Sequence, residues 1–72
     1  MGFSYDKLRG RIREVYQTQE AFAKDLGMSR STLNLKLNNA YEFSQGEMFK
    51  ALELLKLPKS EIDVYFFTPK VR

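Results

Sequence analysis

Residues 18–39 read TQEAFAKDLGMSRSTLNLKLNN, and this stretch decides how the chain folds. A first helical pattern runs over residues 19–26, and a second one follows almost at once. Thr18 and Ser29 precede the two patterns, where the oxygen of an N-cap side chain accepts a hydrogen bond from the first helical turn. Gly27 can adopt the left-handed backbone that ends a helix. We therefore expect two short helices joined by a sharp turn.

The second helix, predicted over residues 30–38, has one apolar and one polar face. Leu33 and Leu37 form an apolar stripe at a spacing of four residues, and Leu35 lies off that stripe. Such a pair of helices is typical of a helix-turn-helix, whose second helix lies in the major groove of DNA. Arginine can pair with guanine and asparagine with adenine through two hydrogen bonds each. The residues that we expect to contact bases are Arg30, Ser31, Thr32 and Asn34.

Five residues match, in type and spacing, the lambda-repressor-like (Cro/repressor) superfamily of helix-turn-helix proteins: Gln19, Ala23, Gly27, Ser29 and Leu33. The chain resembles the short phage-encoded regulators of that superfamily over about residues 4–57. The resemblance implies an all-α, compact bundle of about five short helices around a central helix-turn-helix at about 18–39. One departure is that the superfamily commonly has an aliphatic residue where Lys36 stands, and Leu37 takes the core role here.

The resemblance also implies contacts with the DNA backbone. In the superfamily, the glutamine at the start of the first motif helix contacts a phosphate and braces the recognition helix. The end of the recognition helix and the loop after it also touch the backbone. For the asparagines and the tyrosine in that loop, plain capping and loop chemistry is the alternative interpretation. The expected phosphate-contacting residues are Gln19, Ser29, Lys36, Asn38, Asn39 and Tyr41.

Composition limits the classes of function. The 72 residues carry a formal net charge of +3, and they include no cysteine and no histidine. The chain therefore lacks the usual general base, thiolate ligands and the commonest transition-metal ligand. We expect no enzyme activity, no cofactor, no metal and no small-molecule substrate. The excess positive charge lies within residues 1–40, in the half that holds the helix-turn-helix, as expected for a surface that faces phosphates.

The length suits one domain over residues 1–72. No apolar run approaches the roughly 18 residues that cross a bilayer, and no signal peptide is visible. We expect a cytoplasmic protein with no membrane partner.

The first helix is expected to begin at a cap formed by Ser4 or Asp6 and to end near Tyr16, with residues 1–3 loose. Gly10 falls within this helix, where glycine costs about 1 kcal/mol relative to alanine. We expect a close contact with another helix at this glycine.

Arg9 and Arg13 share a face of the first helix, and three interpretations of them remain open. They can form a solvated surface that pairs in part with Asp6 and Glu14, which would contribute little to stability. They can contact phosphates. For Arg13, the resemblance implies a third option, an ion pair with Glu20.

A capping box and a proline predict one helix in the C-terminal half. Ser44 and Glu47 fit the capping box, so the helix is expected to begin there. It is expected to end near Leu55 or Lys56, before Pro58.

A last element of one or two helical turns is expected from Ser60 to about Tyr65, with Ser60 and Asp63 as a second capping box, followed by extended chain. Ile62 and Phe66 are expected in the core. Because so apolar a cluster near the end of a small domain also suits self-association, a homodimer contact is assigned to Tyr65, Phe67 and Val71.

The leading hypothesis is a sequence-specific regulator of transcription that binds double-stranded operator DNA. It would be a Cro-like repressor of phage or prophage origin that acts by operator occupancy, as a dimer with half-sites about one helical turn apart. The alternative is a protein-interaction module, such as an antirepressor that uses the aromatic segment at residues 64–67. Exposure of that segment, together with the absence of DNA contacts, would favour the alternative.

Overall fold

The computed structural model describes residues 2–70. In it, the apolar side of each α-helix faces a shared core. Those residues form α-helices, one short 3-10 helix and no β-strand, so the expected all-α bundle of about five short helices is confirmed. The elements are, in order, α1 (Asp6–Tyr16), α2 (Gln19–Leu26), α3 (Arg30–Leu37), α4 (Gln45–Leu54), η1 (Lys59–Glu61) and α5 (Ile62–Phe66).

Side-chain caps fix where three of the helices begin. Thr18, Ser29 and Ser44 each accept a hydrogen bond from the backbone N–H three residues later, at 3.1–3.2 Å. Glu47 completes the capping box of α4, because its carboxylate accepts a bond from the backbone N–H of Ser44 at 2.9 Å. These are the caps predicted from the sequence for α2, α3 and α4.

Left-handed residues end the same three helices. Gly27, Asn39 and Lys56 have φ angles of 92°, 67° and 58°. After each of them, the next N–H donates to the carbonyl five positions back, at 2.8–3.0 Å, which satisfies a carbonyl of the last turn. α4 therefore stops at Leu54, slightly before the predicted end, because the chain turns at Lys56 and does not run on to Pro58.

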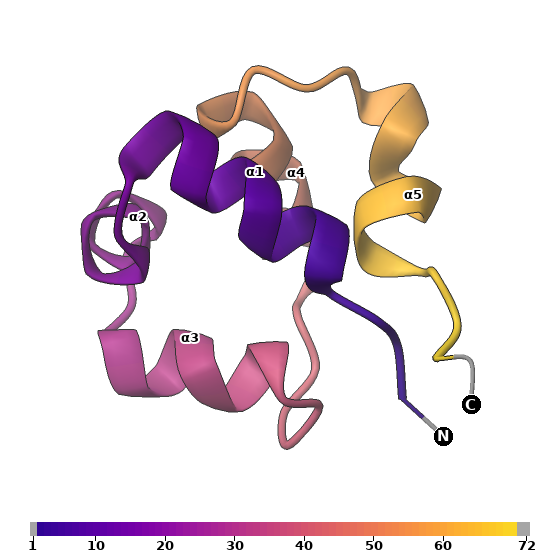
Figure 1. Ribbon diagram of the computed structural model, residues 1–72, viewed down its shortest axis with the longest axis horizontal. Coiled ribbons are helices and arrows are strands. Elements are labelled where there is room, and N and C mark those ends of the chain that lie inside the picture. Colours follow the sequence, from indigo (N-terminus) through magenta and orange to yellow (C-terminus); the bar gives the residue numbers. More distant parts are fainter. Residues whose placement is uncertain (1, 71–72) are drawn as a thin grey trace.

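α2 lies at the centre of the packing and contacts α1, α3 and α4, while α5 closes the core against α1 and α4. Figure 1 shows α3 along the lower edge of the molecule, with α1 above it. The core consists of Tyr5, Leu8, Ile12, Phe22, Ala23, Leu26, Leu33, Leu37, Phe43, Ala51, Leu52, Leu55 and Phe66. Ile62, the other residue predicted for the core near the C-terminus, is half-buried against this cluster.

Two arginines of α1 hold the ends of other helices. The Nη2 of Arg9 donates to the carbonyl of Leu37 at 3.1 Å and to the Oδ1 of Asn38 at 3.0 Å. The Nε of Arg11 donates to the carbonyl of Leu55 at 3.1 Å. Cations at these positions also suit the negative ends of the α3 and α4 dipoles.

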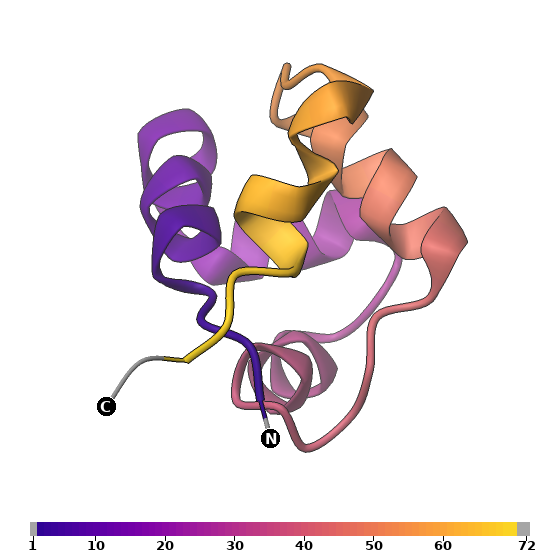
Figure 2. The same ribbon diagram turned by 90° about the vertical axis from the view of Figure 1, so that its right-hand side faces the viewer.

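The N-terminal segment is docked, and the expectation that Phe3 would be loose is wrong. The backbone N–H of Phe3 donates to the Oδ1 of Asn39, and the Nδ2 of Asn39 donates back to the Phe3 carbonyl, both at 3.0 Å. Phe3 also forms an isolated antiparallel bridge with Pro69, and the Ser4 N–H donates to the Thr68 carbonyl at 2.7 Å. Figure 2 shows these two segments side by side, close to the end of α3.

Three local predictions fail at the ends and in the middle of the outer helices. Tyr5 stands at the N-cap of α1 without a side-chain hydrogen bond, so neither Ser4 nor Asp6 caps that helix. A Cβ on Gly10 would meet nothing within 4 Å, so no helix approaches that glycine. The second capping box, predicted at Ser60, is replaced by the 3-10 turn η1, and α5 begins without a side-chain cap.

Candidate functional site

The orientation of α3 follows from its buried leucines. Leu33 and Leu37 are 0% and 3% exposed, which confirms that Leu37 takes the inward position. The opposite side of the helix therefore carries Ser31, Asn34, Leu35 and Asn38, all of them exposed. We call these four residues the α3 face.

The residues predicted to contact bases do not all have free polar groups. Arg30, Ser31 and Asn34 are exposed, as such a role requires. Thr32 is half-buried, and its hydroxyl accepts a hydrogen bond from the Ser29 hydroxyl at 3.0 Å. Ser29 in turn accepts from the Thr32 N–H. This pair is occupied in capping α3, so the structure brings three of the four residues to the surface.

Lys36, predicted to contact phosphate, lies in a different setting. Its ammonium forms a 2.8 Å ion pair with Glu47, donates to the Glu42 carbonyl at 3.1 Å and lies 5.8 Å from the centroid of the Phe43 ring. Burial alone would raise the pKa of the Glu47 carboxyl, but hydrogen bonds from Lys36 and from Ser44 outweigh it and lower that pKa. Lys36 therefore joins α3 to α4 through these contacts, and its contact with phosphate stays a prediction.

The end of α3 also uses its polar groups within the chain. The side chain of Asn38 accepts from Arg9, and the side chain of Asn39 binds both backbone groups of Phe3. These bonds fit the alternative interpretation, capping and loop chemistry, while a phosphate contact at Asn38 and Asn39 stays a prediction. Tyr41, in the loop that follows, is 60% exposed and is the most open of the large apolar side chains among residues 2–70.

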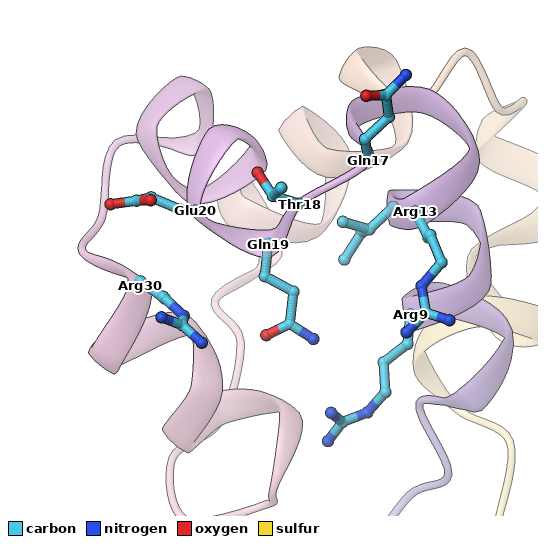
Figure 3. Close-up of a pocket in the computed structure, with 8 residues that line it drawn as sticks. Arg9, Arg13, Gln17, Thr18, Gln19, Glu20 and Arg30 are labelled. Carbon is cyan, nitrogen blue, oxygen red and sulfur yellow. The ribbon is translucent and has the colours of Figure 1, made fainter.

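A hollow of about 390 Å³ opens where α1, α2 and α3 meet. Figure 3 shows that the side chains of Arg9 and Arg13 enter it from α1, that of Gln19 from α2 and that of Arg30 from α3, while Gln17 and Glu20 point away. Ile12, which is 1% exposed, also lines it, so the hollow reaches down to the core. We call the hollow formed by Arg9, Ile12, Arg13, Gln19 and Arg30 the arginine groove.

None of the three guanidinium groups in the arginine groove forms an ion pair with an acid of residues 2–70. The ion pair implied for Arg13 and Glu20 does not form, and Glu14 pairs instead with Arg11, at 3.5 Å. The chain reverses between α1 and α2 at Gln17, whose φ of 70° is unusual for a residue other than glycine. This sharp reversal brings the start of α2 next to the arginines of α1.

The C-terminal aromatic segment is partly open. Phe67 is 42% exposed, and its ring packs edge-on against Phe3 with centroids 5.4 Å apart. Tyr65 is half-buried against the core. Val71, the third residue assigned to a dimer contact, lies outside the described residues. The dimer contact remains a prediction.

Sequence reasoning missed two features of this surface. The spacing of Arg9 and Arg13 placed them on one face of α1, but nothing local indicated that Gln19 and Arg30 would share their groove. The docking of Phe3 was also missed, since its partner Asn39 is 36 residues away.

Comparison with known proteins places the chain in a family. The family described as proteins of unknown function (DUF739) matches residues 1–69. The chain belongs to the DUF739 family. A solved relative is the solution structure of the modulator of repression (MOR) of the temperate bacteriophage TP901-1 from Lactococcus lactis. It shares 39% identity with a TM-score of 0.81, and the match covers 100% of this chain and 97% of that one. Curated protein sequences give no significant match.

These findings overturn the assignment to the lambda-repressor-like superfamily. The matching family is DUF739, and the solved relative is described as a modulator of repression. The five residues that carried the resemblance form a capped helix, a left-handed turn at Gly27 and a second capped helix. Side-chain caps and left-handed turns are common wherever two helices are closely joined, so this geometry does not identify a superfamily. The firm functional link is similarity to a phage regulatory protein.

No helix among residues 2–70 is both long and apolar enough to cross a membrane.

Proposed function

We propose that this chain regulates phage repression by binding a repressor protein. The similarity to the TP901-1 modulator over the whole chain supports a role in repression. Because related folds serve different functions, the mode of action has to be argued from the surface of this chain.

The composition of the α3 face carries the proposal. Leu35 is 41% exposed among polar neighbours, and Tyr41 follows it in the next loop. An apolar residue surrounded by polar ones is typical of protein interfaces, where a few large side chains supply most of the affinity.

The cations of α3 support the same choice. A protein gains affinity for duplex DNA from several lysines and arginines that displace counterions from phosphates. Lys36 is bound to Glu47, so Arg30 is the one exposed cation on α3. Asn38 and Asn39 are also occupied within the chain.

Binding to duplex DNA through α3 is a second candidate. It is favoured by the exposure of Arg30, Ser31 and Asn34 in the first half of α3, where a recognition helix meets base edges. This candidate predicts an affinity that falls steeply as salt rises.

The test is a calorimetric titration of the chain with the repressor encoded in the same phage or prophage genome. We expect binding to weaken about tenfold or more in Leu35→Ala, as expected when a central interface residue is truncated. Val15→Ala is the matched control, because Val15 is also an exposed apolar residue, 36% accessible, but lies on α1, outside both the α3 face and the aromatic segment.

Two outcomes would contradict the proposal. One is an absence of binding between the unmodified chain and that repressor. The other is salt-dependent binding of a DNA duplex by the chain alone, with amide shifts confined to Arg30, Ser31 and Asn34, which would establish the second candidate in its place.

A further inference from the structure

We propose that the arginine groove is a carboxylate-binding site that receives a glutamate or aspartate side chain of the partner. This inference rests on the proposed function, since it takes the partner to be a protein. It assigns a role to Arg13, Gln19 and Arg30, which neither the packing of the core nor the α3 face explains, and a second role to Arg9, which also holds the end of α3.

The first argument is the unbalanced charge of the groove. Three guanidinium groups line one hollow, and no acid of residues 2–70 pairs with any of them. Like charges held together raise the energy of the folded chain, and an anion bound between them would remove that cost. Glu20 is the one acidic residue of the lining, and Figure 3 shows that its side chain points away from Arg9 and Arg13.

The second argument is the placement of Arg30. It occupies the first position of α3, next to the Ser29 cap. A cation is disfavoured there, because the N-terminal end of a helix carries partial positive charge. The same helix end also attracts anions, so Arg30 and the start of α3 favour the same ligand.

The third argument is the number of free donors. Arg9 uses its Nη2 to hold the end of α3, which fixes the guanidinium in place and leaves its other N–H groups available. Arg13 makes no side-chain hydrogen bond within residues 2–70, and neither does Gln19. A planar carboxylate can accept two parallel bonds from one guanidinium and a further bond from a neighbour.

The fourth argument separates a carboxylate side chain from a DNA phosphate. The three arginines surround one hollow of about 390 Å³, and they do not continue as a row of cations along α3, where Lys36 is paired with Glu47. A duplex presents many phosphates in a row, and a protein that grips it gains affinity from several such contacts. A single acidic side chain needs only one hollow. The proposed ligand is therefore an acidic side chain inserted from a partner protein.

The experiment compares the double variant Arg13→Gln/Arg30→Gln with the unmodified chain in the calorimetric titration against the same repressor. Arg9 is left unchanged because its bonds hold α3 in place. The control is Lys7→Gln/Lys50→Gln, which removes the same charge from two exposed lysines outside the groove. We expect the affinity to fall at least about tenfold more in the arginine variant than in the lysine variant.

A simpler probe tests the ligand class directly. In the unmodified chain, we expect acetylated tetraglutamate amide to shift the Nε–H signals of Arg9, Arg13 and Arg30 and the side-chain amide of Gln19. Tetraglutamine amide should leave these signals in place. A mixed-sequence DNA duplex that moves the same signals at lower concentration than the acidic peptide would assign the groove to phosphate and overturn the proposal.

The outcomes separate this inference from the proposed function. Equal repressor affinity in the two double variants would overturn the carboxylate site and leave repressor binding standing. If the unmodified chain does not bind the repressor, the proposed function fails, and the inference that rests on it fails too. Circular dichroism of both double variants checks that they fold like the unmodified chain.

Discussion

Arg9 and Arg11, two residues apart on α1, donate hydrogen bonds to the last carbonyls of two different helices, α3 and α4. Side chains two positions apart on a helix point in nearly opposite directions. One short helix therefore reaches both neighbours, and the ends of α3 and α4 are fixed from a single element.

The first prediction compares Arg11 with Arg13. Arg11→Met should lower the free energy of unfolding by about 1 kcal/mol, because it removes a charged donor from the partly buried Leu55 carbonyl. Arg13→Met should change it by less than about 0.5 kcal/mol, since Arg13 is exposed and holds no such bond. Urea denaturation measures both. Equal losses in the two variants would show that the bond to Leu55 is not what matters.

The second prediction uses two leucines of α3. Leu33→Ala should cost about 2–5 kcal/mol, because Leu33 is fully buried and its truncation leaves a cavity. Leu35→Ala should stay within about 0.5 kcal/mol, since its side chain is largely in water. Thermal unfolding distinguishes them. A melting temperature that falls equally in both would mean that α3 is rotated relative to the structure.

The third prediction concerns the sign of two glycine substitutions. Gly10→Ala should stabilise the chain by about 0.5–1 kcal/mol, because alanine is a better helix former and meets open space at this site. Gly27→Ala should destabilise it by about 1–2 kcal/mol, because a Cβ is strained at φ 92°. Denaturation midpoints of the two variants should shift in opposite directions. A shift in the same direction would refute the roles assigned to these glycines.

The fourth prediction concerns acid. In the folded chain, the pKa of the Glu47 carboxyl is lowered from its ordinary 4.5. At pH values between the lowered pKa and 4.5, this carboxyl therefore binds more protons in the unfolded chain than in the folded chain. The contribution of Glu47 is therefore complete above about pH 4.5, and it is lost as the pH falls through the lowered pKa.

Glu47→Gln should weaken this dependence and reduce stability at neutral pH, because it leaves the Lys36 ammonium without its ion pair. Glu53→Gln, which removes an exposed charge from the same helix, is the control. Unfolding free energies measured between pH 3 and 7 compare the variants. An identical pH profile for Glu47→Gln and the unmodified chain would contradict the prediction.

The features that could be predicted from the sequence are those decided within a few residues. Thr18, Ser29 and Gly27 act on the backbone next to them, so the limits of α2 and the start of α3 were correct. The apolar spacing of Leu33 and Leu37 likewise fixed the inward side of α3.

The features that failed depend on residues distant in the sequence. The docking of Phe3 was missed because its partner Asn39 is 36 residues away, and the ion pair of Lys36 was missed because Glu47 is 11 residues away. The superfamily assignment failed for a related reason. Residues that make a tight turn between helices report on the turn, and they do not report on what the exposed side of the second helix binds.

The bond between the Ser4 N–H and the Thr68 carbonyl has a consequence for the order of folding. It closes a loop that contains nearly the whole chain, and the entropy lost on closing a loop grows with its length. The contacts among α1, α2, α3 and α4 join residues that are much closer in the sequence, so we expect these helices to assemble first. The pairing of the terminal segments, with the bridge between Phe3 and Pro69, should form last. In native-state hydrogen exchange, this terminal pairing should open before the core does. The Ser4 amide should therefore exchange faster than the backbone amides of α2.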